Sequence, residues 1–434
     1  MNVLLSLLQK SPDYMQLLQA VEAKQAAAVS GLSQAPRSHV LAALHEHSGR
    51  PLVAVCQDDL AASRLASELG AFLGEQPPVL PSRELTLAGA IGVSRQWEQK
   101  RLRLLYALAQ GQVPVLVTSL DALLLRTMPR EVLFSASVRL RCGAEYNVDD
   151  LVARLTRAGY TRSSLVEGVG QFALRGGILD VYSPACENPL RAEFFGDELD
   201  TMGYFDPITQ RRTENVEEAV LLPVAETEAH LHPQGTAGLC EDLRAIIARQ
   251  QRRKTPNQAL IDTLQKDCEA LENETLFASA DRYMALIYPE FTTAAAYLSQ
   301  EAVVAFCDHG NLQRAEKEKA EEFGLLLDSF LTSGTLFGEL CDYYGSIEDL
   351  AAQLRGRAVV YCDGFHAARY PESLPTKKLL SFTARQLPGY GGSLETAASD
   401  LKNYTANQYG SIVLCGGQRR GEILKDLLAQ NGLN

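Results

Sequence analysis

Hydrophobic positions at the start of the chain recur with two different periods. Residues 1–28 carry Leu and Ala at helical spacing, which predicts an amphipathic lead-in helix. Short, almost wholly apolar runs at 51–56 and 113–118 predict buried strands. Helical spacing recurs over three further segments: 61–73, 95–109 and 121–127. Strands that alternate with helices in this way indicate a parallel sheet.

The pattern changes near Val138. A helix predicted over 149–158 ends at Gly159, and several strand-like runs then follow without a helix between them, up to Leu222. Strands in series predict an α+β segment inserted into an α/β chain. Helical patterning returns from Glu226 and includes a highly charged helix over 311–323, which is typical of a solvated connecting helix.

The C-terminal part again has a strand, turns and a helix. Apolar runs at 358–362 and 410–417 predict strands, and 420–430 predicts a helix. The Gly- and Pro-rich segment 387–392 lies between them and predicts turns. This order of elements predicts another small α/β unit. The glycines at 416–421 match neither nucleotide-binding fingerprint and are typical of a turn from strand to helix.

The most informative stretch is 174–207, where two apolar-rich runs flank a break that contains Pro and Asn, as in neighbouring antiparallel strands. Successive side chains of a strand point to opposite faces. One face of the second run is apolar and is predicted to lie on a core; it carries Leu190, Ala192 and Phe194. The other face carries Arg191, Glu193 and Phe195.

This second face has two interpretations. A large ring beside an arginine is unusual on a solvent-facing strand, because burial normally removes such a ring from water. Aromatic residues and Arg are enriched in interface cores, so Arg191 and Phe195 can belong to a docking face with Glu193 at its edge. Alternatively, another layer of this protein covers the face, and strand parity alone leaves both open. Arg175 precedes Gly176-Gly177, where a turn or bulge is permitted, and can join the same face.

The same stretch carries a family resemblance. It reads Arg-Gly-Gly-Ile-Leu-Asp-Val-Tyr-Ser-Pro from Arg175, Leu-Arg-Ala-Glu-Phe-Phe-Gly-Asp-Glu-Leu-Asp from Leu190 and Phe-Asp-Pro-Ile-Thr-Gln from Phe205. These motifs resemble the second domain of the excision-repair protein UvrB and, more closely, the corresponding domain of the bacterial transcription-repair coupling factors. In both families this domain binds the damage-recognition protein UvrA. The family's contact residues, two arginines and an aromatic, match Arg175, Arg191 and Phe195, so the resemblance favours the docking interpretation.

A UvrB-like chain is expected to carry a phosphate-binding loop near residue 31. The pattern Gly-x4-Gly-Lys-Ser/Thr falls on Gly31, Pro36, Arg37 and Ser38, of which only the first glycine and the last hydroxyl residue match. Pro36 has a fixed φ and no N–H, so it removes a phosphate donor. Arg37 has a planar guanidinium group, whereas the loop needs the compact ammonium group of a lysine. We therefore expect a loop that has lost its ligand, and the resemblance implies the same for coupling factors.

A second nucleotide-site motif is also incomplete. The apolar run that ends at Asp308 stands where the resemblance would place a metal-binding carboxylate pair, but His309 occupies the position of the catalytic glutamate. An apolar run that ends in one Asp is common in α/β proteins, so this observation is weak alone. Beside the altered phosphate loop it favours lost hydrolysis.

Composition restricts the remaining functions. The formal net charge of −12 argues against tight binding to a phosphate backbone, and the basic run at 249–254 is typical of a helix C-terminus. Nine cysteines without a Cys-x-x-Cys pair fit reduced thiols and argue against a disulfide framework or a zinc site. No apolar run is long enough to span a bilayer, and the N-terminus lacks a signal-peptide pattern. We expect a cytoplasmic protein with no cofactor, no metal and no membrane partner.

Together with the resemblance, these observations predict an α/β fold. It comprises a degenerate RecA-like domain, of the P-loop NTPase type, with an inserted α+β UvrA-binding domain, followed by a small α/β domain. The expected limits are 1–137 for the first part of the RecA-like domain, 138–223 for the insertion, 224–355 for its second part with connecting helices, and 356–434 for the small domain.

The resemblance also sets the expected function. It implies the N-terminal module of a transcription-repair coupling factor, which recruits UvrA to stalled RNA polymerase for nucleotide excision repair and is itself non-catalytic. Intact proteins of this family are ATP-dependent DNA translocases, which reach RNA polymerase and duplex DNA through domains without a counterpart here, so the sequence resembles an N-terminal fragment. Two alternatives remain: a nucleotide hydrolase, against which Pro36 and Arg37 argue, and a DNA-binding module, against which the acidic balance argues.

Overall fold

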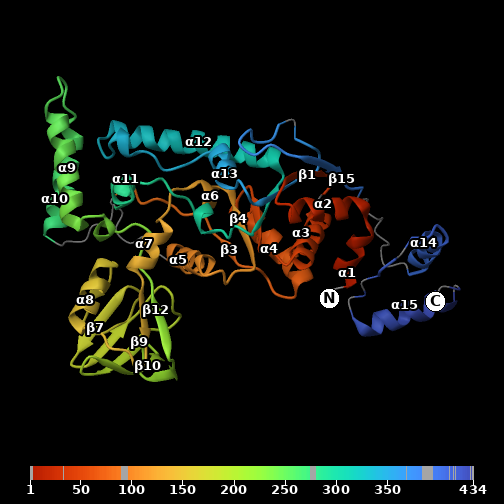
Figure 1. Cartoon of the computed structure of the whole chain (residues 1–434), viewed down its shortest axis with the longest axis horizontal. Helices are drawn as coiled ribbons and strands as arrows, with labels where there is room; N and C mark the ends of the chain where they lie inside the picture. The colour runs from red at the N-terminus through yellow and green to blue at the C-terminus, as the bar shows by residue number, and fades with distance from the viewer. Residues whose placement is uncertain are drawn as a thin grey trace. The chain divides into compact units, whose positions relative to one another are not determined.

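The computed structural model describes residues 3–32, 34–88, 96–273, 280–367, 369–383, 394–409, 411–413, 415, 417–430 and 432 (Figure 1). The chain divides into two compact units, Met1–Phe382 and Thr383–Asn434. Among the described residues, no helix is both long enough and apolar enough to cross a membrane.

A seven-stranded parallel sheet forms the centre of the first unit. Its order is β15-β1-β14-β13-β2-β4-β3, and every neighbouring pair runs parallel. The strands are β1 (Ala26–Ser30), β2 (Leu52–Cys56), β3 (Val79–Leu80), β4 (Val115–Ser119), β13 (Val303–Cys307), β14 (Ala358–Cys362) and β15 (Lys378–Ser381). All of β1, β2, β4, β13 and β14 is buried, as expected for a parallel sheet that is covered on both faces.

Helices cover the two faces of this sheet, which explains why its strands are apolar without alternation. Along β2, for example, successive side chains enter two separate hydrophobic clusters, Val53 and Val55 the first, and Leu52, Ala54 and Cys56 the second. The second cluster is completed by α2 (Pro12–Glu22), α3 (Gln34–Ser48) and α4 (Asp59–Leu73). The first is completed mainly by α5 (Gln96–Ala109), α6 (Leu120–Leu124) and the helices that follow the insertion.

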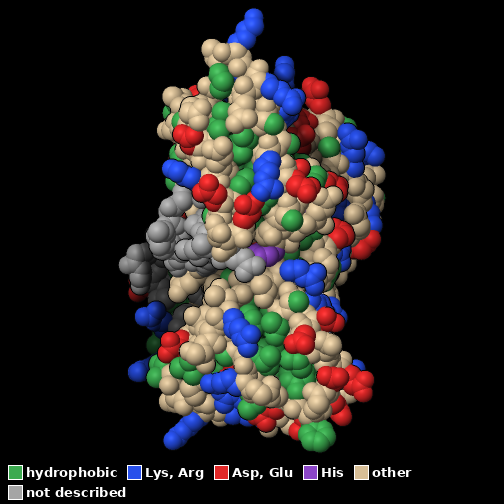
Figure 2. Space-filling view, turned by 90° about the vertical axis from the view of Figure 1, so that its left-hand side faces the viewer, with side chains coloured by type: hydrophobic (Ala, Val, Ile, Leu, Met, Phe, Trp, Pro, Cys, Tyr) green, Lys and Arg blue, Asp and Glu red, His purple; other side chains and the backbone are tan. Residues whose placement is uncertain are grey.

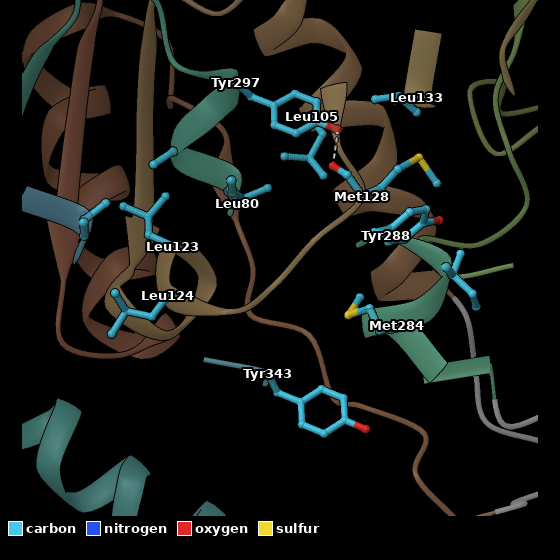
Figure 3. Packing of buried hydrophobic residues seen from close by; sticks show 14 of the residues in the cluster. Leu80, Leu105, Leu123, Leu124, Met128, Leu133, Met284, Tyr288, Tyr297 and Tyr343 are labelled. Carbon is cyan, nitrogen blue, oxygen red and sulfur yellow. Dashed lines mark hydrogen bonds between the residues drawn. The ribbon is translucent and has the colours of Figure 1, made fainter. Parts of the chain in front are cut away.

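The first cluster joins segments from both sides of the insertion. Figure 3 shows Leu105 of α5 and Met128 beside Met284, Tyr288 and Tyr297, which come more than a hundred and fifty residues later in the chain. The Tyr297 hydroxyl donates a hydrogen bond to the Met128 carbonyl at 2.7 Å. The chain before the insertion and the chain after it therefore share one core.

The remaining elements of the first unit are shorter or lie outside the central sheet. They are α1 (Val3–Ser6), η1 (Leu7–Lys10), α7 (Arg130–Ala136), η2 (Ala229–Leu231), α9 (Gly235–Gln251), α10 (Gln258–Glu272), η3 (Ala280–Tyr283), α11 (Met284–Ile287), η4 (Ala294–Tyr297), α12 (His309–Thr332), η5 (Gly338–Leu340) and α13 (Ile347–Gln353). The pair α9 and α10 forms a helical hairpin at one end of this unit (Figure 1).

The insertion begins and ends in two strands that pair with each other. The chain leaves the parallel sheet through β5 (Val138–Arg141) and returns through β12 (Glu218–Leu221), which run antiparallel. Between them lie α8 (Val148–Arg157) and a six-stranded sheet in the order β11-β10-β9-β8-β7-β6. Its strands are β6 (Thr161–Arg162), β7 (Gln171–Arg175), β8 (Ile178–Val181), β9 (Leu190–Phe195), β10 (Glu198–Phe205) and β11 (Arg212–Asn215). A hydrophobic cluster of its own supports this inserted domain. The predicted parallel sheet with an α+β insertion is therefore confirmed.

Two sequence-based expectations differ from this topology. Residues 26–28 were expected to end the lead-in helix, but they belong to β1, which pairs with β14 and β15 and places these apolar Ala side chains in the clusters on the two faces of the sheet. A separate small domain was expected from residue 356, but β14 and β15 both pair in the seven-stranded sheet. The length and apolar character of the run at 358–362 suit a strand in either place, the small domain or the large sheet. In the structure it forms a central strand of the first unit.

In the second unit, the structure describes α14 (Leu394–Ala406) and α15 (Gln418–Gln430). The predicted helix over 420–430 is therefore present, two residues longer at its start. Residues 411–413 of the predicted last strand are irregular. The predicted turns over 387–392 lie outside the described residues.

A candidate protein-docking site on the inserted domain

Two hairpins bring the three predicted docking residues to one sheet. Arg175 ends β7 and pairs with Ile178 of β8 across the Gly176-Gly177 turn. Arg191 and Phe195 lie on β9, which pairs with β8 in the register that places Asp180 opposite Arg191. Residues in register on neighbouring strands point to the same face. Arg175, Asp180 and Arg191 therefore share a face, and Phe195 follows at an even offset along β9.

The opposite face of β9 lies on the core, as parity predicts. Leu190 and Ala192 are fully buried in the cluster of the inserted domain, and Phe194 packs against it. We call the other face, which carries Arg191, Glu193 and Phe195, the outer face. Only one end of it is covered, by a small cluster of Val166, Ala173, Phe205 and Tyr182. The alternative of a complete covering layer therefore does not hold among the described residues.

One buried carboxylate organises both arginines. Asp180 has no exposed surface, and its two oxygens accept hydrogen bonds from Arg191 Nε at 2.7 Å and Arg191 Nη2 at 2.9 Å. Arg175 Nη2 donates to the same carboxylate at 2.5 Å. The Arg175 side chain is 49% exposed and that of Arg191 is 20% exposed. Arg191 is thus held mainly within the protein, whereas Arg175 keeps half its side chain in solvent.

Two further contacts fix Arg191. Its guanidinium carbon lies 4.6 Å from the centre of the Phe205 ring, within the range of a cation–π contact. Arg191 Nη1 donates to the carbonyl of Gln210 at 3.4 Å. The hydrogen bonds to Asp180 raise the pKa of the Arg191 guanidinium above its ordinary value. The side chain is therefore charged and immobilised before any partner arrives.

Phe195 is the most exposed large hydrophobic side chain in the described strands of this sheet. It is 84% exposed and ends β9 just before the two-residue turn at Gly196, whose φ is 63°. A phenylalanine with this exposure gains nothing from the fold, because burial is what stabilises such a ring. Figure 2 shows hydrophobic side chains gathered on the half of the molecule that holds the inserted domain, with basic side chains beside them.

Sequence reasoning missed the residue that holds the site together. Asp180 was read only as part of a motif, yet it stands between Leu179 and Val181 in an apolar strand. The signal was available, because an acidic residue inside an apolar strand is rarely buried unless it is paired. What was lacking was the register that sets it opposite Arg191.

The four residues of the altered phosphate loop lie at the carboxyl end of β1 and in α3. Gly31 follows β1 with a φ of 83°, and Pro36, Arg37 and Ser38 lie in the first turns of α3. The strand, loop and helix order of a phosphate loop is thus retained. Position 33, which lies in the loop between Gly31 and α3, is outside the described residues.

Two backbone N–H groups and one hydroxyl of this loop are hydrogen-bonded within the protein. The Gly31 N–H donates to the Gly364 carbonyl at 3.0 Å, and the Leu32 N–H donates to the Asp363 carbonyl at 3.2 Å. The Ser38 hydroxyl donates to the Glu68 carboxylate. A side chain at position 31 would also collide with the Phe382 carbonyl, 1.9 Å from the ideal Cβ position. The N–H groups of Gly31 and Leu32 are therefore already bonded to another segment of the chain.

The second incomplete motif lies near this loop, at the start of α12. Asp308 has a φ of 68° and caps α12 by accepting the Asn311 N–H at 3.4 Å. His309 is fully buried, and its backbone N–H donates to Asp363 at 2.7 Å. Both residues therefore have structural roles at the carboxyl end of the sheet.

Comparisons with known proteins single out the inserted domain. The model of the UvrB interaction domain family matches residues 138–226, which start at β5 and end just beyond β12. A transcription-repair-coupling factor of Myxococcus xanthus is 38% identical over 221 residues, 49% of this chain and 18% of that protein. Those of Staphylococcus aureus strain USA300 and Bacillus subtilis strain 168 are 25% and 22% identical over 99% of this chain and 36% of their own length.

These relatives are much longer than the chain, which spans about a third of the two proteins matched along its whole length. The resemblance expected from the motifs of β7 to β10 is nevertheless confirmed, since the family match falls on those strands. The chain carries a UvrB interaction domain and is similar along almost its whole length to part of the transcription-repair-coupling factors.

Proposed function

We propose that this chain is the adaptor module of a transcription-repair coupling factor and that its inserted domain binds UvrA through the outer face. In the intact factor this contact would bring UvrA to a stalled RNA polymerase for nucleotide excision repair. Contacts with RNA polymerase and duplex DNA, and ATP-driven movement along DNA, would belong to the remainder of such a factor. Cytoplasmic location follows from the same proposal.

The observation that carries this proposal is the exposure of Phe195 on the face that also holds two ordered arginines, inside the region that matches the UvrB interaction domain. Interface cores are enriched in aromatic and arginine side chains, and this face carries both kinds. Because Asp180 already orders Arg175 and Arg191, little side-chain entropy is lost when a partner binds. The site is thus preorganised for a protein partner.

We further propose that the chain does not hydrolyse nucleotides. Support comes from the loop at Gly31, where backbone N–H groups donate to carbonyls of residues 363 and 364 and no N–H exists at Pro36. Calorimetric titration with Mg-ATP is expected to give no heat of binding, and ATP is expected to leave the unfolding temperature unchanged. Stabilisation by ATP would contradict this part of the proposal.

The docking proposal is tested by the affinity for purified cognate UvrA, measured by calorimetry or a surface biosensor. Phe195→Ala is expected to weaken binding by about 2 kcal/mol, roughly thirty-fold, as for a central interface anchor. The ring contacts solvent, so the variant is expected to stay folded. Phe365→Ala is a matched control, because that ring is 93% exposed and lies outside the inserted domain. Unchanged affinity of Phe195→Ala would overturn the proposal.

A further inference from the structure

The outer face has a second exposed apolar side chain, Ile178, at the start of β8. Ile178 pairs in register with Arg175 of β7 on one side and with Glu193 of β9 on the other. Residues in register share a face, so Ile178 lies on the outer face with Glu193. The next residue, Leu179, is fully buried in the cluster of the inserted domain, as alternation along a strand requires. Ile178 is 37% exposed and belongs to none of the hydrophobic clusters among the described residues.

Phe195 is a diagonal neighbour of Ile178 on this face. It stands two residues beyond Glu193, the β9 residue that pairs with Ile178. Positions in this diagonal relation are about 7–8 Å apart, within reach of an aromatic ring. The Phe194 N–H donates to the Gly177 carbonyl at 2.7 Å, so β9 stays against the turn between β7 and β8 up to its end. Ile178 and Phe195 therefore lie next to each other at the turn end of the outer face, and we call them the turn-end patch.

The residues around the turn-end patch leave it open. Gly176, in the turn, has no side chain, and nothing lies within 4 Å of a Cβ placed there. Glu193 pairs with Arg212 of β11 at 3.4 Å, on the side of β9 that lies away from β8. Glu198 of β10 stands in register with Phe195 and is exposed, so it borders the patch on the β10 side.

The guanidinium groups of both arginines are engaged further from the turn than Ile178. Arg175 Nη2 and Arg191 Nε donate to Asp180, which lies two residues beyond Ile178 along β8. The guanidinium of Arg191 also lies over Phe205, a member of the small cluster that covers the other end of the face. The turn end is therefore apolar at its centre, with a carboxylate at its border.

We propose that Ile178 is a further contact residue for the partner, and that Ile178 and Phe195 together bind one continuous apolar surface of UvrA. This inference rests on the proposed function and adds to it a residue beyond the two arginines and the ring. An isolated exposed isoleucine needs no partner, because such residues are common on protein surfaces. Ile178 differs because it adjoins Phe195 and faces open space at Gly176. A partner surface that covers both side chains removes more apolar area from water than one that covers the ring alone.

The contact at Ile178 is tested by the affinity of purified cognate UvrA for Ile178→Ala, Ile178→Thr and the matched control Ile423→Ala. Threonine keeps the branching at Cβ that suits a strand, but it is smaller and polar. Ile423 is also an exposed isoleucine, at 50%, but lies in the second unit. We expect both Ile178 variants to weaken binding about five-fold and Ile423→Ala to leave it unchanged. Thermal unfolding checks the fold of each variant, and Ile178→Thr decides the test if Ile178→Ala does not fold.

The single apolar surface is tested by the double variant that combines Ile178→Ala with Phe195→Ala. Substitutions of neighbouring residues that share a partner are not additive. We expect the double variant to lose less affinity than the product of the two single losses, because a partner that has lost its contact with the ring is also held less closely against Ile178. A loss equal to that product would show two independent contacts and would overturn the single surface.

The outcomes separate this inference from the proposed function. If Phe195→Ala loses affinity while both Ile178 variants bind like the unaltered protein, the contact at Ile178 is wrong and the proposed function stands. If no variant at either position loses affinity, both are wrong. If only the Ile178 variants lose affinity, the shared surface and the role of Phe195 are wrong.

Discussion

At the scale of single residues, Asp180 has the largest structural consequence for the outer face. Removing its charge would leave Arg191, which is mostly buried, without the carboxylate to which it is hydrogen-bonded. An uncompensated buried charge costs far more than the loss of an exposed ion pair. The arginines that the sequence resemblance assigns to a partner thus depend first on a residue of their own chain.

The variant Asp180→Asn is accordingly expected to lower the free energy of unfolding by about 3 kcal/mol. Chemical denaturation measures this change. Asp200→Asn, on the exposed side of β10, is the control and is expected to change stability by less than about 0.5 kcal/mol. Equal stabilities of the two variants would show that Asp180 does not hold the arginines.

A second residue, His309, makes stability depend on pH. It is fully buried between Tyr361 and Tyr370, and neither ring nitrogen has a hydrogen-bond partner among the described residues. Burial lowers the pKa of His309 below its ordinary value of 6.5, and nearby carboxylates only partly offset this effect. The unfolded chain therefore binds a proton at a higher pH than the folded chain. The stabilisation from His309 is present above pH 6.5 and is lost as the pH falls below it.

We expect the free energy of unfolding to fall more steeply between about pH 7 and pH 5 in the unaltered protein than in His309→Phe, which keeps an aromatic ring. One proton changes this free energy by at most about 1.4 kcal/mol per pH unit. Denaturation at several pH values measures both slopes. Identical slopes in the two proteins would contradict the buried neutral imidazole.

At the scale of elements, the turn between β7 and β8 sets the position of Arg175. Gly176 has a φ of 61°, and nothing lies within 4 Å of a side chain placed there. At Gly177 an added Cβ would lie 2.6 Å from the Phe194 carbonyl oxygen, which is too close for van der Waals contact. The Phe194 N–H donates to the Gly177 carbonyl at 2.7 Å, so this turn lies close against β9.

Gly177→Ala is therefore expected to be the more harmful of two otherwise identical substitutions. It must move the turn away from β9 and is expected to cost about 2 kcal/mol or more of stability and to weaken UvrA binding. Gly176→Ala meets only the backbone strain of a positive φ, about 1 kcal/mol. Denaturation and UvrA affinity measure both effects, and the reverse order would show that the close approach at Gly177 is unimportant.

At the scale of the whole molecule, a buried ionic cluster fastens the end of the insertion to the parallel-sheet core. Glu226 follows β12 and accepts two hydrogen bonds from Arg101 Nε of α5, at 3.0 and 2.9 Å. Neither residue has exposed surface. Burial would raise the pKa of Glu226, but Arg101 and Arg83 outweigh it and lower the pKa below its ordinary value.

Glu226→Gln is expected to lower the free energy of unfolding by about 3 kcal/mol or more, because the buried guanidinium of Arg101 loses its counter-charge. The charge-matched control is Glu131→Gln, which removes an exposed carboxylate of α7. Denaturation compares the two. Since the folded-state pKa of Glu226 is lowered, its contribution is also expected to vanish in acid, as the pH falls through that value.

Much of the molecule was determined by the local sequence. Apolar runs without alternation, as in Leu52–Cys56 and Val303–Cys307, require burial on both faces, so they predict a parallel sheet wherever they lie. Alternation in Leu190–Phe195 places Arg191 and Phe195 opposite the core, because strand geometry fixes the face of every side chain. These properties depend on neighbours along the chain alone.

Tertiary structure decided the features that join distant residues. The placement of Ala358–Cys362 between β1 and β13, and the contact of Arg191 with Asp180, depend on strand order and register. Ala26–Ala28 have a helical preference that a fully buried position in the sheet overrides. Packing across the whole chain decides which of several locally similar segments occupies each place in the sheet. The local sequence therefore determines on which face of a strand a side chain lies, but not which distant residue it contacts there.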